Sequence, residues 1–213
     1  MTWESITVGQ YQELYRLSLS TNLDDFDKVE KAVCILYNLS ESEVDDLKRY
    51  QFMEYAKQIS FIFSKEAIPG KAQNYLKCGL KKYKINYKVT DLTHGQYVSI
   101  QHFADKPIEN MHYILACVVN PVRFGIPFKN KADNHQKYSD DLLNARMIDV
   151  YHSCVFFCKV YTSSIKAIRG YLENQMMTKG ATKEEATTLL NLSINAMDGF
   201  IQQKNLQILS ELV

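Results

Sequence analysis

Residues 75–89, YLKCGLKKYKINYKV, change the chain from a helical hydrophobic period to a period of two. Positions 83, 85, 87 and 89 are aromatic or aliphatic, and the positions between them are lysine or asparagine. Successive side chains of a strand point to opposite faces, so this pattern predicts a strand with one wet face. Leu76, Cys78 and Leu80 alternate in the same way around Gly79. We therefore expect a two-stranded ribbon with a bend or bulge at Gly79.

Helices are expected on both sides of this ribbon. A Ser or Thr followed three residues later by Gln or Glu is the capping-box spacing of a helix start. Apolar residues at helical spacing follow such starts, and after Pro107 the residues Met111, Ile114, Leu115 and Val118 share one helical face. The four capping boxes are Thr7 with Gln10, Ser40 with Glu43, Thr93 with Gln96, and Thr182 with Glu185.

Helices and strands are segregated along the chain, which predicts an α+β fold. We expect a mostly helical protein with a small central antiparallel sheet and a C-terminal helical arm. Three segments are predicted: a helical lobe over 1–70, the sheet with its covering helices and a surface loop over 71–138, and the arm over 139–213. The loop is residues 120–140, which hold two of the four prolines, and the arm begins with a long helix to about residue 178, broken near Asp149.

The composition describes an ordinary folded chain and excludes several classes of protein. Apolar residues make up 46% of the 213 residues, and the formal net charge is +1, too small to attract nucleic acid or an anionic membrane as a whole. No apolar run approaches the roughly 20 residues that span a bilayer, and the first ten residues do not resemble a signal peptide. The five cysteines are odd in number and scattered, which indicates a reducing compartment, and we expect a cytoplasm.

Candidate catalytic and metal-binding residues are better explained by packing or capping. Cys154 and Cys158 share a helical face near His152, but a structural zinc site needs about four ligands and no second pair has ligand spacing. His112 lies in an apolar helix and is expected to be a hydrogen-bonded structural histidine. No glycine-rich phosphate loop occurs. We expect a protein that is not an enzyme and has no cofactor or metal, although a cysteine nucleophile with a distant histidine stays an alternative.

The lysines of residues 77–88 are the one candidate for nucleic-acid contact. Lysines neutralise phosphates and aromatic rings stack on bases, so Lys81, Lys82, Lys84 and Lys88 beside the tyrosines are a possible site. The pleat argues against it, because lysines and tyrosines on opposite faces form no shared platform. Lysines guarding an edge strand are the competing interpretation.

Four short motifs stand out in the first part of the chain: ITVGQY at 6–11, ILYNLS at 35–40 followed by EVD at 43–45, DLTHGQY at 91–97, and HYILA at 112–116. With these motifs the chain resembles small virion-associated proteins of tailed bacteriophages of gut Bacteroidetes, especially the ring-forming tail-barrel and connector proteins of crAss-like phages. The resemblance covers about residues 5–125. Physically these positions are caps and core residues, so the resemblance implies a shared fold more strongly than a shared role, and it carries no catalytic residues.

The resemblance implies a structural role, in which copies associate head to tail into a closed ring in the tail barrel or portal-proximal connector. We expect contacts with other copies and with other tail or portal proteins, in a virion assembled in the bacterial host cytoplasm. A tail-assembly chaperone absent from the mature virion is the second hypothesis, and a nucleic-acid-binding protein is the third. The expected interface residues are Arg123, Phe124, Phe128, Tyr138 and Phe200.

Overall fold

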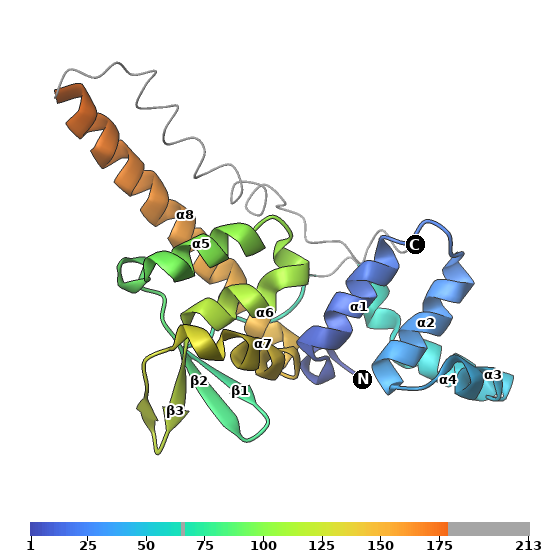
Figure 1. Ribbon diagram of the computed structural model, residues 1–213. Helices are drawn as coiled ribbons and strands as arrows, with labels where there is room; N and C mark the ends of the chain where they lie inside the picture. The colour runs from blue at the N-terminus through green and yellow to red at the C-terminus, as the bar shows by residue number, and fades with distance from the viewer. Residues whose placement is uncertain (65–66, 179–213) are drawn as a thin grey trace.

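The computed structural model describes residues 1–64 and 67–178. These residues form eight α-helices and four strands, joined by short 3-10 turns (Figure 1). The helical content of 63% and the small antiparallel sheet confirm the predicted α+β fold class. The helices are α1 (Val8–Ser18), α2 (Asp25–Tyr37), α3 (Glu41–Asp45), α4 (Arg49–Gln58), α5 (His94–Phe103), α6 (Pro107–Val118), α7 (His135–Leu143) and α8 (Met147–Thr178).

The sheet has four strands in the order β1-β2-β3-β4, all antiparallel. The strands are β1 (Tyr75–Cys78), β2 (Lys81–Ile85), β3 (Val119–Arg123) and β4 (Ile126–Pro127). Alternation predicted the first two, and Leu76, Tyr83 and Ile85 are buried as expected. Leu80 departs from the expected alternation because it lies in the turn and is fully exposed.

The prediction of a long surface loop over residues 120–140 is wrong, because this segment forms most of β3, all of β4 and most of α7. Pro121 argued against a strand, since proline donates no backbone hydrogen bond. The ladder tolerates Pro121 because its carbonyl oxygen still accepts a hydrogen bond from Phe128 N at 2.8 Å. The sheet is consequently four strands wide and not the two-stranded ribbon predicted from residues 75–89.

The helix expected from residue 139 to about 178 is two helices, and the break lies at residues 144–146 instead of near Asp149. At this break the N-terminal segment pairs with the link between α7 and α8. Val8 N donates to Ala145 O at 3.0 Å, and Met147 N donates to Ile6 O at 2.8 Å. About the first third of the expected C-terminal arm, to near residue 165, therefore packs in the core.

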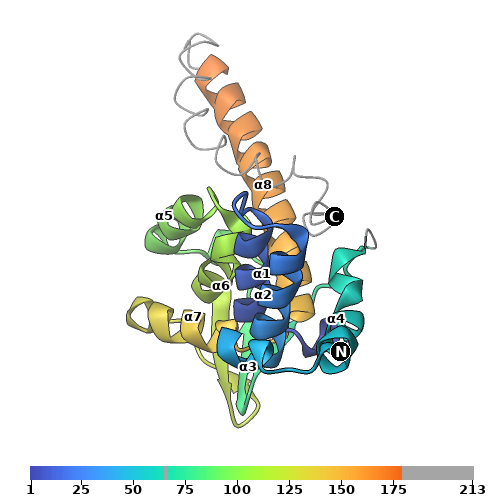
Figure 2. The same ribbon diagram turned by 90° about the vertical axis from the view of Figure 1, so that its right-hand side faces the viewer.

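One hydrophobic core joins residues of the helices with residues of β1, β2 and β3, whereas both residues of β4 are exposed. It includes Leu14 of α1, Val33 of α2, Leu115 of α6, Leu142 of α7 and Phe157 of α8. The boundary expected after residue 138 falls inside α7. Beyond the core, α8 projects away from the other helices (Figures 1 and 2).

The predicted capping boxes at Thr7, Ser40 and Thr93 begin α1, α3 and α5, which confirms three of the four. Each side-chain oxygen accepts from the backbone N–H three residues later, which satisfies a donor that the helix leaves free. The fourth box, Thr182 with Glu185, lies outside the described residues, as does the predicted interface residue Phe200.

Candidate interaction surface

The two hairpin turns of the sheet lie at the same end. Gly79 turns β1 into β2 with φ +59°, and the pair Phe124-Gly125 turns β3 into β4 with φ +50° and +80°. Lys82 pairs with Val122 across β2 and β3, so the antiparallel register brings Leu80 to the level of Phe124. Figure 1 shows the hairpins projecting below the helices.

Phe124 occupies a backbone conformation that its residue type disfavours. A two-residue turn with positive φ at both central positions is the type I′ turn, which prefers Asn-Gly or Asp-Gly. A bulky residue at positive φ is a conformational outlier and costs about 1–3 kcal/mol. The ring gains no compensating burial, because Phe124 is 102% exposed. Neither packing nor turn chemistry explains a phenylalanine here.

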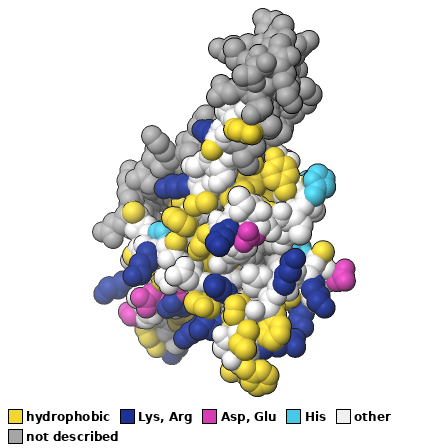
Figure 3. All heavy atoms as spheres, turned by 90° about the vertical axis from the view of Figure 1, so that its left-hand side faces the viewer, with side chains coloured by type: hydrophobic (Ala, Val, Ile, Leu, Met, Phe, Trp, Pro, Cys, Tyr) yellow, Lys and Arg dark blue, Asp and Glu magenta, His cyan; other side chains and the backbone are white. Residues whose placement is uncertain are grey.

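Three further apolar side chains on the same two hairpins are exposed. Leu80 is 108% exposed, Ile126 is 62% exposed and Phe128 is 49% exposed. We call Leu80, Phe124, Ile126 and Phe128 the hairpin tip. Figure 3 shows hydrophobic side chains at the lower end of the molecule with Lys and Arg side chains around them. A group of exposed apolar side chains of this kind is typical of a protein-protein contact.

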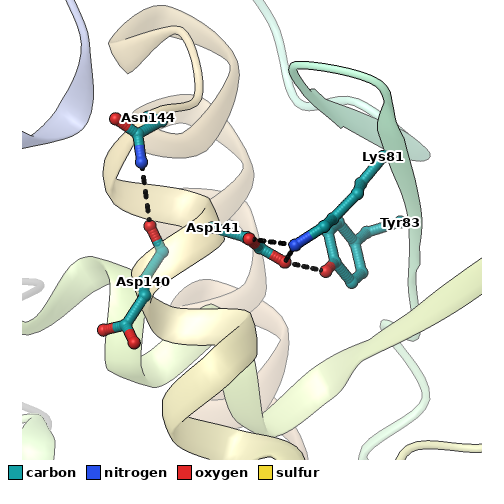
Figure 4. Close-up of polar contacts among 5 residues, drawn as sticks. All are labelled: Lys81, Tyr83, Asp140, Asp141 and Asn144. Carbon is teal, nitrogen blue, oxygen red and sulfur yellow. Dashed lines mark hydrogen bonds and ion pairs between the residues drawn. The ribbon is translucent and has the colours of Figure 1, made fainter.

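A polar contact holds the base of the tip against α7 (Figure 4). Lys81 Nζ donates to Asp141 Oδ1 at 2.6 Å, and Tyr83 Oη donates to Asp141 Oδ2. Burial and then the Asp141 carboxylate raise the pKa of Tyr83, so the phenol stays protonated as the donor. Asn144 Nδ2 donates to Asp140 O at 3.2 Å and closes the end of α7. The contacts of Lys81 and Tyr83 with Asp141 therefore hold the start of β2, next to the tip, against α7.

Of the five predicted interface residues, Arg123, Phe124 and Phe128 lie at this end of the sheet and are exposed. The prediction of Tyr138 as an interface residue is wrong, because its side chain is only 6% exposed. Its ring packs edge-on against Tyr83 with 5.4 Å between the ring centroids. Tyr138 also lines a cavity of about 310 Å³ beneath Leu80 and Arg123. It supports the tip from inside and has almost no surface to offer a partner.

The outward face of the sheet carries two of the four lysines predicted to contact nucleic acid, and a tyrosine lies beside them. Lys82 and Lys84 share this face with Lys77 and Tyr75, and Lys82 Nζ lies 4.4 Å from the centre of the Tyr75 ring. The separation of lysines from tyrosines holds for Tyr83, which points inward, but not for Tyr75. An aromatic ring and lysines therefore do share one face.

The other two predicted lysines lie elsewhere. Lys81 is on the inward side, paired with Asp141. Lys88 lies beyond β2 and lines a cavity of about 610 Å³ together with Lys84 and Lys129.

The thiols near His152 pack in the core. Cys154 and Cys158 are buried, and the hydrogen bond between them, followed by burial, raises the pKa of Cys154. His152 Nε2 lies 3.1 Å from the carbonyl oxygens of Ile68 and Pro69.

Burial also raises the pKa of Cys117, to about 12. Thiols held protonated are poor nucleophiles and poor metal ligands. Within residues 1–64 and 67–178, no three His, Cys, Asp or Glu side chains are grouped as a metal site would need.

His112 is the hydrogen-bonded structural histidine that the sequence predicted. Its Nδ1 lies 2.8 Å from Gln12 Nε2, which also reaches Ile108 O at 3.0 Å and Glu109 O at 2.8 Å. Burial, and then the charge of Arg16, lowers the pKa of His112 to about 4. A neutral His112 accepts from Gln12 and ties α1 to α6.

Comparison with protein-family models, with curated proteins and with solved structures found no match. In the part of the chain that the structure describes, no helix combines the length and apolar character needed to cross a lipid bilayer.

Sequence reasoning missed Leu80, Ile126 and Tyr75. The signal that could have located the tip was Gly125 between two short apolar stretches, since a glycine at such a position is typical of a tight hairpin. The two prolines beside it, at 121 and 127, concealed the strands.

Proposed function

We propose that this protein is a non-enzymatic structural component of a phage virion, which associates with copies of itself into a ring in the tail barrel or portal-proximal connector. It would be assembled in the cytoplasm of the bacterial host and would contact neighbouring tail or portal proteins. The virion setting rests on the sequence resemblance. The capacity for self-association rests on the hairpin tip.

One observation carries the proposal: Phe124 is fully exposed on a backbone that disfavours it. Strained backbone of this kind clusters at functional positions such as active sites, ligand clamps and switch regions, so it points to a function for this turn. The neighbouring Leu80, Ile126 and Phe128 extend the apolar area, and burying them against a second chain would remove their surface from water. Aromatic side chains are enriched among the residues that contribute most binding energy.

Light scattering coupled to size exclusion, with negative-stain imaging of the eluted species, tests the proposal. The expected result is a discrete closed oligomer whose mass stays constant above the concentration at which it assembles. A monomer at every concentration, alone and with virion proteins from the same phage, contradicts it.

The tail-assembly chaperone stays the alternative, since an exposed apolar tip also suits a transient partner. Mass spectrometry of purified virions separates the two functions. A ring component is present in stoichiometric amounts, whereas a chaperone is absent.

A nucleic-acid-binding role is the third candidate, and the placement of Tyr75 among Lys77, Lys82 and Lys84 on the outward face of the sheet favours it. Base stacking on Tyr75 with phosphate contacts from the lysines would bind single strands. Binding of a fluorescent oligonucleotide must then weaken steeply with salt, because phosphate contacts release counterions. Absent or salt-insensitive binding excludes it.

A further inference from the structure

The small net charge of the chain conceals a strong separation of charge. Residues 71–89 and 119–138, which form the sheet and its flanks, hold ten Lys or Arg and one acidic residue. Residues 19–47, around α2 and α3, hold eight Asp or Glu and two Lys. The two regions lie on different sides of the molecule: the hairpins project downward, and α2 and α3 flank the other side (Figures 1 and 2).

The acidic region also has an exposed aromatic side chain. Phe26, in the first turn of α2, is 61% exposed, and its ring lies 5.5 Å from that of Phe52 in α4. Asp25 and Asp27 flank it directly. Among the described residues, neither carboxylate is within ion-pair distance of a Lys or Arg. We call Asp25, Phe26 and Asp27 the lobe surface.

The hairpin tip has the complementary composition. Its apolar side chains are flanked by Arg123 and Lys129, both exposed and, within the described part of the chain, without an acidic partner. An apolar centre with a charged rim is the usual anatomy of a protein interface, and opposite rim charges fix which surfaces meet. The tip and the lobe surface lie apart in one chain, so such a contact joins different copies.

We propose that the hairpin tip of one copy docks on the lobe surface of the next copy. This inference rests on the proposed self-association and names the two surfaces that make it. The contact is heterologous, because each copy offers a different surface to each of its two neighbours. Heterologous contacts generate a ring when the rotation closes and a filament when it does not.

Reciprocal charge reversal tests the pairing. Arg123→Glu with Lys129→Glu gives an acidic tip, and Asp25→Lys with Asp27→Lys gives a basic lobe surface. Each variant alone should raise the concentration for half-assembly at least about tenfold, because like charges then face each other. Mixing the two variants should restore assembly, since each acidic tip then meets a basic lobe surface and each basic tip meets an acidic one.

Two controls accompany the mixture. Circular dichroism and urea unfolding establish that each variant is folded. Asp45→Lys with Asp46→Lys makes the same charge change at the end of α3, outside the lobe surface. Because salt screens charges that lie far apart, this variant should change the half-assembly concentration by less than about threefold relative to the wild type. Equal weakening by this control assigns the effect to net charge and overturns the pairing.

The outcomes separate this inference from the function on which it rests. A wild-type chain that never assembles contradicts the proposed function itself. A wild-type assembly that Phe124→Asn abolishes, but that neither charge reversal weakens, keeps self-association and overturns the tip-to-lobe pairing. Failure of the folded variants to assemble on mixing also overturns it.

Discussion

Helix α6 and the hairpin tip are both rich in apolar side chains, but only those of α6 are explained by packing. In α6 the side chains of residues 114–118 are all buried, and packing accounts for each of them. In the tip, Leu80 and Phe124 are fully exposed, and Phe124 adopts a strained φ as well. Apolar residues that packing explains describe the fold. Those that it leaves unexplained point to function.

One isoleucine in each region gives the sharpest test of this contrast. Ile114→Ala in α6 should lower the free energy of unfolding by about 2–5 kcal/mol, because it leaves a cavity in the core. Ile126→Ala in the tip should change it by less than about 0.5 kcal/mol. Urea unfolding of the monomeric species measures both. Similar losses at the two sites would mean that the tip is part of the core.

The pH dependence of stability tests the buried contact between α1 and α6. The pKa of His112 falls from 6.5 to about 4 on folding, so the unfolded chain binds the proton more readily. The contribution of neutral His112 to the free energy of unfolding is complete above pH 6.5 and is lost as the pH falls towards 4. The loss should approach about 3 kcal/mol at pH 4.

His112→Gln is the matched control, because glutamine keeps a hydrogen-bonding side chain and does not titrate. Its unfolding free energy should be less dependent on pH between 6.5 and 4 than that of the wild type. Identical pH profiles would show that folding does not lower the pKa of His112, which would contradict its burial as a neutral side chain.

The base of the tip is expected to contribute less than the core. Asp141→Asn removes the charge that accepts from Lys81 and Tyr83, and hydrogen bonds to charged groups contribute about 1.5–3 kcal/mol. Solvent screening reduces the Lys81 part, since that side chain is 51% exposed. We expect a loss of about 1–2 kcal/mol. Lys84→Met on the outward face, where the lysine has no ion pair within the described residues, should cost less than about 0.5 kcal/mol.

Much of the fold followed from local sequence patterns. Capping boxes located the starts of α1, α3 and α5, and a period of two located β1 and β2. Strand β4 was missed because it has only two residues, one of which is Pro127. Strand β3 was missed because Pro121 masked its pattern and because its partner strand β2 lies more than 30 residues away. Such pairing leaves no local signal.

The candidate site was predicted only in part. Placing Arg123, Phe124 and Phe128 in an exposed segment was correct, whereas Tyr138 turned inward to pack on Tyr83. The amphipathic character of tyrosine suits either place, so its type alone could not decide. The grouping of Leu80 with Phe124, and the separation of basic from acidic regions, depend on strand register and helix placement, which composition does not contain.

The substitution at Phe124 itself is expected to cause no loss of stability. Phe124→Asn places a residue that tolerates positive φ in the same turn, so the free energy of unfolding should stay the same or rise by about 1 kcal/mol. Urea unfolding checks it. A clear loss of stability would show that the ring packs within its own chain.

The most direct test of the central claim is the mass of Phe124→Asn by light scattering, at the concentration where the wild type is oligomeric. Val98→Asn is the control, because Val98 on α5 is also exposed, at 48%, and lies away from the hairpins. We expect the Phe124→Asn chain to be folded and monomeric and the Val98→Asn chain to keep the wild-type mass. A folded Phe124→Asn chain that keeps the wild-type oligomer would contradict the assignment of the hairpin tip as the surface of self-association.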